Sequence, residues 1–383
     1  MRESKLLIYG ATGYTGRLAV AEAVRSGLRP VVGGRDPEKL AALASPGAVA
    51  HGLETRAFGL DDPATLAGAL EDVAVVLHCA GPFSRTALPM YDACRKTGAH
   101  YLDITGEVDV FEALAARGAE AAAAGIMVLP GVGFDVVPSD CLIADLAARH
   151  PGGRTLRLGL AARSGASRGT MRTVAQAIGQ FRIRRDGAIA TVRPGQLRHA
   201  FDFGPPPGAA LVGVLGDVTT AFHSTGIPNI ETYLQATRSF TRLTRILRGF
   251  GPLLAGRTGR ALLNRLLDRA PEGPSESARQ TAHGILVAEI EDAEGRRAAA
   301  RVRTPDPYGF TATVAVAIAG RALAGDFKPG YQTPSSAYGA DLLREFDDVT
   351  WEVLDHDSAP RHSGGRWHDP TSLRKRGADC QSE

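Results

Sequence analysis

Three glycines near the start of the chain have the spacing of a loop that binds a dinucleotide. Gly10, Gly13 and Gly16 follow the apolar run 5–9 and precede an alanine- and valine-rich run. When a strand is followed by a glycine turn and then by a helix, the backbone of the turn can approach a pyrophosphate closely. The positive end of the helix dipole then attracts the negative charge of the pyrophosphate. The alternative is a tight turn without a ligand. The residues that we predict to bind the dinucleotide here are Gly10, Thr12, Gly13, Tyr14, Thr15 and Gly16.

The residues after the second predicted strand decide which dinucleotide fits. Arg35 stands where an acidic residue would bind the 2′-hydroxyl of NAD, and its guanidinium can pair with the 2′-phosphate of NADP. Lys39 adds a second positive charge on the following helix. Asp36, beside Arg35, would favour NAD instead if its carboxylate reached the ribose. We predict that the cofactor is NADP(H).

A Gly-Pro pair follows the strand predicted at 73–78. We expect this rigid turn to lie against the ribose and nicotinamide side of the cofactor, and the alternative is an ordinary strand-to-helix turn. The residues that we predict to bind the cofactor here are Cys79, Ala80, Gly81, Pro82 and Phe83.

Hydride transfer needs a protein group that polarises the acceptor or supplies a proton. Tyr101 and Asp103 lie in the strand predicted at 100–104, and Asp135 follows the strand predicted at 126–129. Because the carboxyl ends of parallel strands meet at one edge of a sheet, we expect these three side chains to be catalytic. For each carboxylate the alternative is a structural role, such as a helix cap.

Other polar side chains near this edge have two interpretations each. Glu107 and the pair Ser139-Asp140 reach the cofactor edge or cap helices. Cys79 is a nucleophile or a buried, inert thiol. His223 contacts substrate or is a solvated loop residue.

Strands and helices alternate through the first 150 residues. The predicted strands are 5–9, 30–34, 55–58, 73–78, 100–104 and 126–129. This alternation is typical of a doubly wound parallel sheet, a Rossmann domain. After residue 150, a strand at 155–162, a helix at 170–181 and a hairpin of 284–291 with 298–303 indicate an α+β domain whose sheet is mainly antiparallel.

Several strings at these loops resemble a known family. They are CAGPF at 79–83, the spaced pattern from Tyr91 to Glu107, and GVGFDVVPSD at 131–140. Shorter matches follow at 167–170, 224–228 and 333–334, with Arg168 standing where we expect a glycine. Together they resemble the saccharopine dehydrogenase-like oxidoreductases, most closely the branch that includes the trans-acting enoyl reductases of polyketide-lipid assembly.

The resemblance implies how the chain is divided. It implies an NADP-binding Rossmann domain over 1–150 and a substrate and dimerisation domain over 151–330, with a segment over 331–355 that packs back on the first domain. It also implies a homodimer. The composition of 356–383, rich in Ser, Pro, Gly and charge, predicts a disordered tail.

The segment 237–270 is a basic, amphipathic helical insertion. It carries eight arginines, one acid (Asp268) and many leucines. Such a helix packs on its own domain, lies on an anionic membrane surface, or docks an acidic partner. An acyl carrier protein bearing a thioester would be such a partner, and the resemblance favours this interpretation.

Composition excludes several other classes of protein. With 383 residues, 44% hydrophobic and 22% charged, the chain can bury a large core in about two domains, which excludes disordered and collagen-like classes. The formal net charge of +3 is too small to imply a nucleic-acid partner, and the chain has no apolar run long enough for a membrane span. Its four cysteines lie far apart with no CxxC pair, which excludes a zinc ribbon and favours a reducing cytoplasm.

We therefore predict an NADPH-dependent reductase of a conjugated C=C bond, acting on an acyl or polyketide-like substrate that is free or bound to a carrier, in a cleft between two domains. The first alternative is a saccharopine-type imine (C=N) reductase. The second is an NADP-binding scaffold or redox sensor without catalysis.

Overall fold

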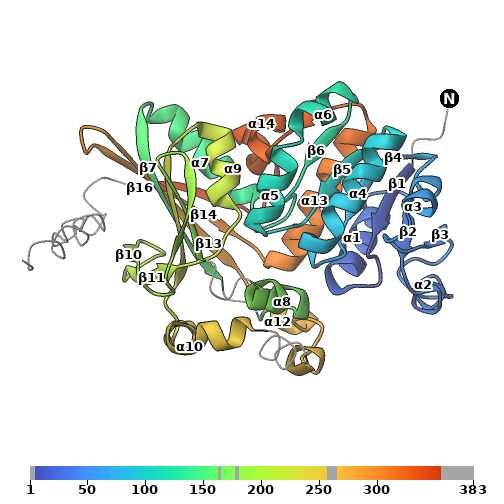
Figure 1. Cartoon of the computed structure of the whole chain (residues 1–383), viewed down its shortest axis with the longest axis horizontal. Helices are drawn as coiled ribbons and strands as arrows, with labels where there is room; N and C mark the ends of the chain where they lie inside the picture. Colours follow the sequence, from blue (N-terminus) through green and yellow to red (C-terminus); the bar gives the residue numbers. More distant parts are fainter. Residues whose placement is uncertain (1–4, 163–164, 177–180, 257–264, 355–383) are drawn as a thin grey trace, which may run out of the picture.

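The computed structural model describes residues 5–162, 165–176, 181–256 and 265–354. These residues form two β-sheets, with helices packed on and between them (Figure 1). The first sheet, with β1 to β6, occupies the right half of the view, and the second sheet, with β7, β10, β11, β13, β14 and β16 labelled, occupies the left half.

The first sheet is parallel throughout. Its strands are β1 (Lys5–Tyr9), β2 (Val31–Gly34), β3 (Thr55–Ala57), β4 (Val73–His78), β5 (His100–Asp103), β6 (Met127–Leu129) and β15 (Gly330–Tyr331). They run in the order β15-β6-β5-β4-β1-β2-β3, and every neighbouring pair is parallel. This is the doubly wound order of a Rossmann fold, as predicted.

Helices cover both faces of this sheet. They are α1 (Tyr14–Arg25), α2 (Pro37–Leu43), α3 (Pro63–Ala69), α4 (Phe83–Thr97), α5 (Val108–Ala115) and α6 (Gly118–Ala123). Helix α7 (Val137–Arg149), which follows β6 in the chain, packs instead on two strands of the second sheet, β13 and β14. Side chains alternate along β1, so that Leu6 and Ile8 pack on the face with α1, while Leu7 and Tyr9 pack on the face with α3 and α4.

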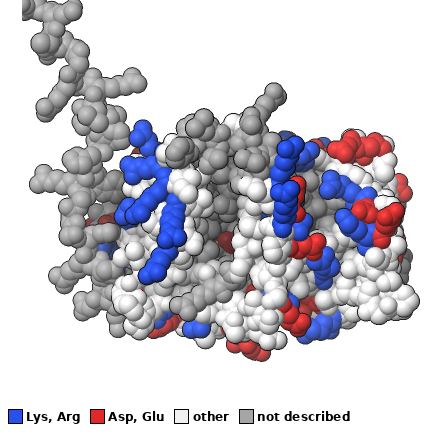
Figure 2. Space-filling view, turned by 90° about the horizontal axis from the view of Figure 1, so that it is seen from below, with Lys and Arg blue, Asp and Glu red and all other residues white. Residues whose placement is uncertain are grey.

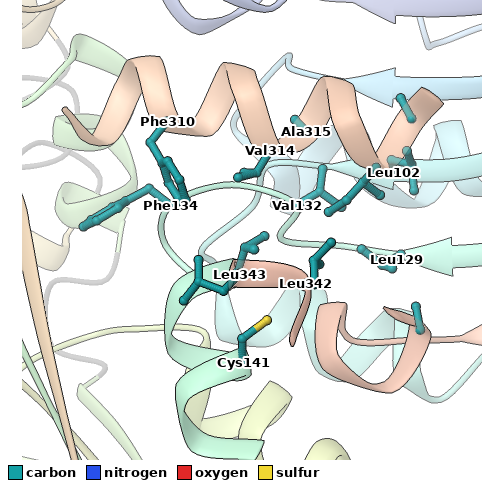
Figure 3. Packing of buried hydrophobic residues seen from close by; sticks show 14 of the residues in the cluster. Leu102, Leu129, Val132, Phe134, Cys141, Phe310, Val314, Ala315, Leu342 and Leu343 are labelled. Carbon is teal, nitrogen blue, oxygen red and sulfur yellow. The ribbon is translucent and has the colours of Figure 1, made fainter. Parts of the chain in front are cut away.

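Helix α13 (Pro307–Leu323) comes from the segment that we predicted within 151–330, yet it packs on α1, β1 and β4 of the first sheet. The reason is its apolar surface, which buries Val314 and Ala315 among first-domain side chains. Figure 3 shows these two residues on one side of Leu102 and Val132, with Leu342 and Leu343 on the other.

The second sheet is mixed. Its strands are β7 (Gly153–Ala162), β8 (Phe181–Arg185), β9 (Ala188–Val192), β10 (Arg198–Phe201), β11 (Gly208–Val212), β12 (Asn229–Gln235), β13 (Gly284–Asp292), β14 (Arg297–Thr304) and β16 (Thr350–Leu354). They run in the order β10-β11-β12-β7-β13-β14-β16, with β8 pairing β12 and β9. Strands β7 and β12 are parallel, and the other described pairs are antiparallel, including the predicted hairpin β13–β14.

The remaining helical segments are α8 (Arg168–Gln176), α9 (Asp217–Thr225), α10 (Arg238–Ala255), α12 (Glu276–Gln280), α14 (Pro334–Tyr338) and the 3-10 helix η1 (Ala340–Glu345). The segment 331–355 divides between the sheets, because it starts in β15 beside β6 and ends in β16 beside β14. The predicted tail 356–383 lies outside the described residues. None of the described helices is both long and apolar enough to cross a bilayer.

A glycine in the second sheet gives a test of this packing. A Cβ added at Gly159 of β7 would lie 2.6 Å from Cδ2 of Phe201, so that the buried ring must move. We expect Gly159→Ala to lower the free energy of unfolding by about 1–3 kcal/mol, the usual cost of overpacking. Urea unfolding followed by circular dichroism measures this change.

The control is Gly320→Ala in α13, where a Cβ would meet no atom within 4 Å. There we expect stability to be unchanged or raised by up to about 1 kcal/mol, since alanine favours helix. Equal effects at both positions would contradict the packing described here.

Candidate functional site

The glycine loop is built for close approach between backbone segments. Gly10 has φ +84°, and a Cβ there would lie 2.8 Å from the amide nitrogen of Ala80. A Cβ at Gly16 would lie 2.2 Å from the carbonyl oxygen of Gly10. Gly13 is the N-cap of α1, and no side chain caps this first turn. The helix N-terminus therefore offers backbone N–H groups to an anion, which fits the pyrophosphate of a dinucleotide.

A cavity of about 560 Å³ opens at this loop. Its wall contains Gly10, Thr12, Gly13, Tyr14 and Thr15 from the glycine loop, and Cys79, Ala80, Gly81, Pro82 and Phe83 from the loop after β4. Gly16 does not line the cavity, because it packs against Gly10 inside the turn. The remaining predicted cofactor residues thus lie together, apart from Lys39.

The end of β2 suits a 2′-phosphate better than a ribose hydroxyl. Arg35 is exposed and lines the cavity. The Asp36 carboxylate caps α2 by accepting from the backbone N–H groups of Glu38 and Lys39, at 3.1 Å each, and it pairs with the Lys39 ammonium at 3.3 Å. Because Asp36 and Lys39 are engaged with each other, Arg35 is the charged side chain of this corner that faces the cavity.

Glu107, which is not part of the loop 79–83, fixes the C-terminal end of that loop. Its carboxylate accepts from the backbone N–H groups of Phe83, at 2.8 Å, and Ser84, at 2.9 Å. These are the first N–H groups of α4, which begins at Phe83. Glu107 therefore caps a helix, one of its two interpretations from the sequence, and that helix is the preceding one, α4.

Tyr101 and Asp103, which we expected to be catalytic, do not line the cavity. Both are fully buried. The Tyr101 hydroxyl donates to Asp103 Oδ2 at 2.6 Å, and Asp103 Oδ1 accepts from the backbone N–H groups of Thr105, at 2.9 Å, and Gly131, at 3.0 Å. Burial raises the pKa of Asp103 to about 6 against these bonds. The pair joins the β5 and β6 loops and has no open face toward the cavity, which fits the structural alternative, and its catalytic role stays a prediction.

Asp135 is the predicted catalytic residue that does face the cavity. It is exposed on the cavity wall, next to Gly106 and following Gly133 and Phe134 of the β6–α7 loop. The protein surrounding it displaces water and raises the pKa of its carboxyl to about 6. Asp135 can therefore exchange a proton near neutral pH with a molecule in the cavity.

The other polar residues weighed from the sequence lie away from the cavity or are inert. Burial raises the pKa of the Cys79 thiol to about 12, so it stays protonated at neutral pH. Asp140 accepts from the hydroxyl of Ser224 and from the backbone N–H of Ser335, at 2.7 Å, and is fully buried. His223 lies within α9, and its ring packs 5.0 Å from that of Tyr331.

The second domain adds an apolar stretch to the cavity wall. This stretch is formed by Leu160 and Ala162 of β7, Val214, Leu215 and Gly216 before α9, and Leu234 of β12, while the polar lining of this domain lies mainly in Ser167, Arg168, Thr170 and Arg172. A cofactor bound along the first domain would thus share the cavity with an apolar compartment.

Three residues that sequence reasoning missed complete the cavity mouth. The Tyr308 hydroxyl accepts from the backbone N–H of Ser167 at 2.6 Å, and its ring packs edge-on against Tyr14. Thr311 accepts from the backbone N–H of Phe134 at 3.0 Å. Glu272 accepts from the guanidinium of Arg17, at 2.5 Å, in the first turns of α1. Each of the three lies at least 141 residues away in the sequence from its hydrogen-bond partner, so local sequence patterns could not predict these contacts.

Comparison with known proteins agrees with the nucleotide site. Residues 6–129 match the family model described as the saccharopine dehydrogenase NADP-binding domain. This match assigns NADP(H) as the cofactor of the first domain, and the free Arg35 fits its 2′-phosphate.

Curated relatives named trans-acting enoyl reductase resemble part of the chain. The one from Mycobacterium leprae is 34% identical over 154 residues, and one from Mycobacterium tuberculosis is 32% identical over 160 residues. Each match covers 39% of this chain and 36% of the relative, so the chain matches about a third of the length of these relatives.

A solved structure shares the architecture of almost the whole chain. Apo saccharopine dehydrogenase (L-Glu forming) from Saccharomyces cerevisiae superposes with a TM-score of 0.61 and 13% identity, and covers 92% of this chain and 100% of that one. At this identity the likeness shows the fold. It confirms the predicted pairing of a Rossmann domain with a second, mixed-sheet domain.

The choice of cofactor can be tested at Arg35. We expect Arg35→Ala to weaken NADPH binding roughly 10- to 100-fold, the worth of a charge-assisted hydrogen bond to phosphate, and to leave NADH binding within about twofold. Fluorescence titration with both nucleotides measures the two affinities. Lys39→Ala is the matched control, because Lys39 does not line the cavity. A loss of affinity for both nucleotides at Arg35→Ala would show a role in stacking and not in phosphate recognition.

Proposed function

We propose that this chain, whose first domain belongs to the saccharopine dehydrogenase NADP-binding family, is an NADPH-dependent reductase of the conjugated C=C bond of an enoyl substrate. The acceptor would be an acyl or polyketide-like thioester. The name of the mycobacterial relatives supports this reaction, and the cavity supports this class of substrate.

The observation that carries the proposal is the apolar wall of the second domain. Leu160, Leu215 and Leu234 face the cavity that the nucleotide loops enter. An acyl chain buried there would gain about 25 cal/mol for each Å² of apolar surface removed from water. A charged acceptor would gain nothing from this wall and would lose its hydration.

Asp135 is the group of this chain that would act on the acceptor. Bound NADPH supplies the hydride that adds to the β-carbon. Asp135 then gives its proton to the α-carbon, where the electron pair of the C=C bond arrives. Its pKa, raised to about 6 by burial, keeps part of the population protonated at neutral pH.

The arginines near the cavity weaken the alternative of imine reduction. A saccharopine-type substrate carries carboxylates, which would require free cations. Arg168 lines the cavity, but its Nε donates to the carbonyl of Ala270 at 3.0 Å, and Arg172 is paired with Asp268. Both guanidinium groups therefore already have protein partners.

Helix α10 is the surface that we propose for a carrier protein. Arg238, Arg242, Arg245 and Arg248 are exposed at spacings of four, three and three residues, which places them on one face. Leu243 and Ile246 beside them are 37% and 51% exposed, while Leu247 packs inward. Figure 2 shows Lys and Arg side chains gathered over this region, where α10 lies in Figure 1. Such a face suits an acidic helix with an apolar stripe.

The segment after α10 connects this face with the cavity mouth. Asp268 pairs with Arg172 of α8, and Glu272 with Arg17 of α1. A carrier docked on α10 would therefore lie next to the elements that line the entrance.

Two further expectations remain predictions. The homodimer would show in the molar mass measured by light scattering, and the location in the cytoplasm would show in cell fractionation.

The reaction is tested by following NADPH absorbance with trans-2-enoyl thioesters and, beside them, with amine and aldehyde pairs. We expect oxidation of NADPH with the enoyl set only. Asp135→Asn should lower the rate about 100-fold or more, the usual worth of a general acid, while NADPH affinity stays within about twofold. Turnover with the amine set alone would favour imine reduction, and tight binding without any turnover would favour the scaffold.

The carrier surface is tested by reversing its charge. We expect the triple change Arg242→Glu, Arg245→Glu and Arg248→Glu to raise KM for a carrier-bound enoyl substrate at least about tenfold and to spare a free thioester, because only the carrier contacts α10. The matched control reverses Arg25, Arg29 and Lys96, which are exposed on the first domain. An equal effect on both substrates would refute docking at α10.

A further inference from the structure

Three hydroxyl groups form a row on the cavity wall. They belong to Ser167, which directly precedes α8, to Thr170 in the first turn of α8, and to Tyr308 in the first turn of α13. All three residues line the cavity. Ser167 Oγ lies 3.1 Å from Thr170 Oγ1, and Thr170 Oγ1 lies 3.2 Å from the hydroxyl oxygen of Tyr308. Thr170 is therefore the middle of the row, and Ser167 and Tyr308 are its two ends.

Two backbone N–H groups donate to the ends of this row. The N–H of Thr170 donates to Ser167 Oγ at 3.1 Å, and the N–H of Ser167 donates to the hydroxyl oxygen of Tyr308 at 2.6 Å. Within the part of the chain that the structure describes, these two bonds and the two hydroxyl–hydroxyl contacts are all the hydrogen bonds that the three hydroxyls make.

The row has one donor more than its contacts use. Three hydroxyls and two N–H groups supply five donors, whereas each of the four contacts uses one donor. Whichever way the two hydroxyl–hydroxyl contacts are oriented, one O–H proton has no acceptor among the described residues. Because all three residues line the cavity, this proton is available to an oxygen atom of a molecule bound there.

The free proton belongs to Tyr308 in the most favourable arrangement of the row. Ser167 is only 4% exposed, so its O–H group gains most by donating to Thr170. If Thr170 donates in turn to Tyr308, each hydroxyl accepts from one neighbour and donates to the next, and such chains strengthen through mutual polarisation. The oxygen of Tyr308 then accepts from Thr170 and from the N–H of Ser167, and its own proton faces the cavity.

The Tyr308 hydroxyl lies close to the groups that we propose for the reaction. Thr311, one helical turn further along α13, accepts from the backbone N–H of Phe134, which precedes Asp135. On another side, the ring of Tyr308 packs 5.2 Å from the ring of Tyr14 in the glycine loop. The free donor is therefore placed between the glycine loop and the loop that carries the proposed proton donor.

We propose that the Tyr308 hydroxyl binds the carbonyl oxygen of the acyl thioester and stabilises the negative charge that this oxygen gains during reduction. The inference rests on the proposed function. When hydride bonds to the β-carbon, the π electrons of the C=C bond move onto the α-carbon and the carbonyl oxygen, and the nucleotide is oxidised to NADP⁺. Tyr308 keeps its proton and donates a hydrogen bond to that oxygen. When the α-carbon takes the proton of Asp135, the C=O bond is restored and the saturated thioester is formed.

The role is tested with Tyr308→Phe, which removes the donor and keeps the ring. We expect kcat with a trans-2-enoyl thioester to fall about 100-fold or more, the worth of one donor to an oxyanion, while NADPH affinity stays within about twofold. Tyr338→Phe is the matched control, because that hydroxyl donates to the carbonyl of Asp326 at 3.0 Å and Tyr338 does not line the cavity. The control should keep kcat. Weaker NADPH binding with an unchanged kcat in Tyr308→Phe would assign the donor to the cofactor and overturn the proposal.

A second measurement detects the hydrogen bond without turnover. A saturated acyl thioester with a ¹³C-labelled carbonyl, bound together with NADP⁺, gives a carbonyl band in infrared difference spectra. In the wild type we expect this band at a lower wavenumber than in an apolar solvent, because a hydrogen bond weakens the C=O bond. Tyr308→Phe should move the band back up, and Tyr338→Phe should leave it in place.

The infrared result decides the proposal even if Tyr308→Phe does not fold. A wild-type band at the position seen in the apolar solvent would overturn the proposal, and so would an unmoved band in a folded Tyr308→Phe protein. Failure of the proposed function would look different. The wild type would then oxidise no NADPH with any enoyl thioester, whereas the band of the saturated thioester would still report whether Tyr308 binds its carbonyl.

Discussion

The constraint on which the site depends is the contact between two backbone segments at the carboxyl edge of the first sheet. The turn after β1 meets the loop after β4, and at Gly10 there is no room for even a Cβ beside Ala80. The strands β1, β2, β4, β5 and β6 run in parallel, so the loop that follows each of them begins at this same edge of the sheet. A side chain at the crossing would separate the two loops and so divide the nucleotide site. Glu107 then fixes the outer loop by capping α4.

Much of the first domain could be predicted because its information is local. Each strand is a short apolar run, and each helix start at Asp36 and Asp62 is an acid followed by proline, which the structure shows as N-caps. The place of the glycine loop and of Arg35 at the cavity was predictable for the same reason, since each lies within a few residues of the end of its own strand.

The parts that could not be predicted depend on contacts between distant segments. Helix α13 covers the first sheet although it follows the second sheet in the chain, and Tyr308 and Thr311 bring it to the cavity. Tyr101 and Asp103 looked catalytic because a strand end places them at the functional edge. The position of a residue in a strand does not show whether its carboxylate already has hydrogen-bond partners. Asp103 has three, because it accepts from two backbone N–H groups and from the Tyr101 hydroxyl.

Four carboxylates lie buried or enclosed around this edge, and their bonding separates their roles. Asp103 and Asp140 accept several hydrogen bonds each, which repay part of the cost of burial and hold loops from different parts of the chain together. Asp135 keeps an open side toward the cavity, and the carboxylate oxygens of Asp217 have no hydrogen-bond partner within the described part of the chain. A buried carboxyl without hydrogen-bond partners costs free energy, and an apolar residue of similar size at the same position would stabilise the packing more. Asp135, the acid that the fold leaves open to the cavity, is therefore the one whose place at this edge we explain by chemistry and not by packing.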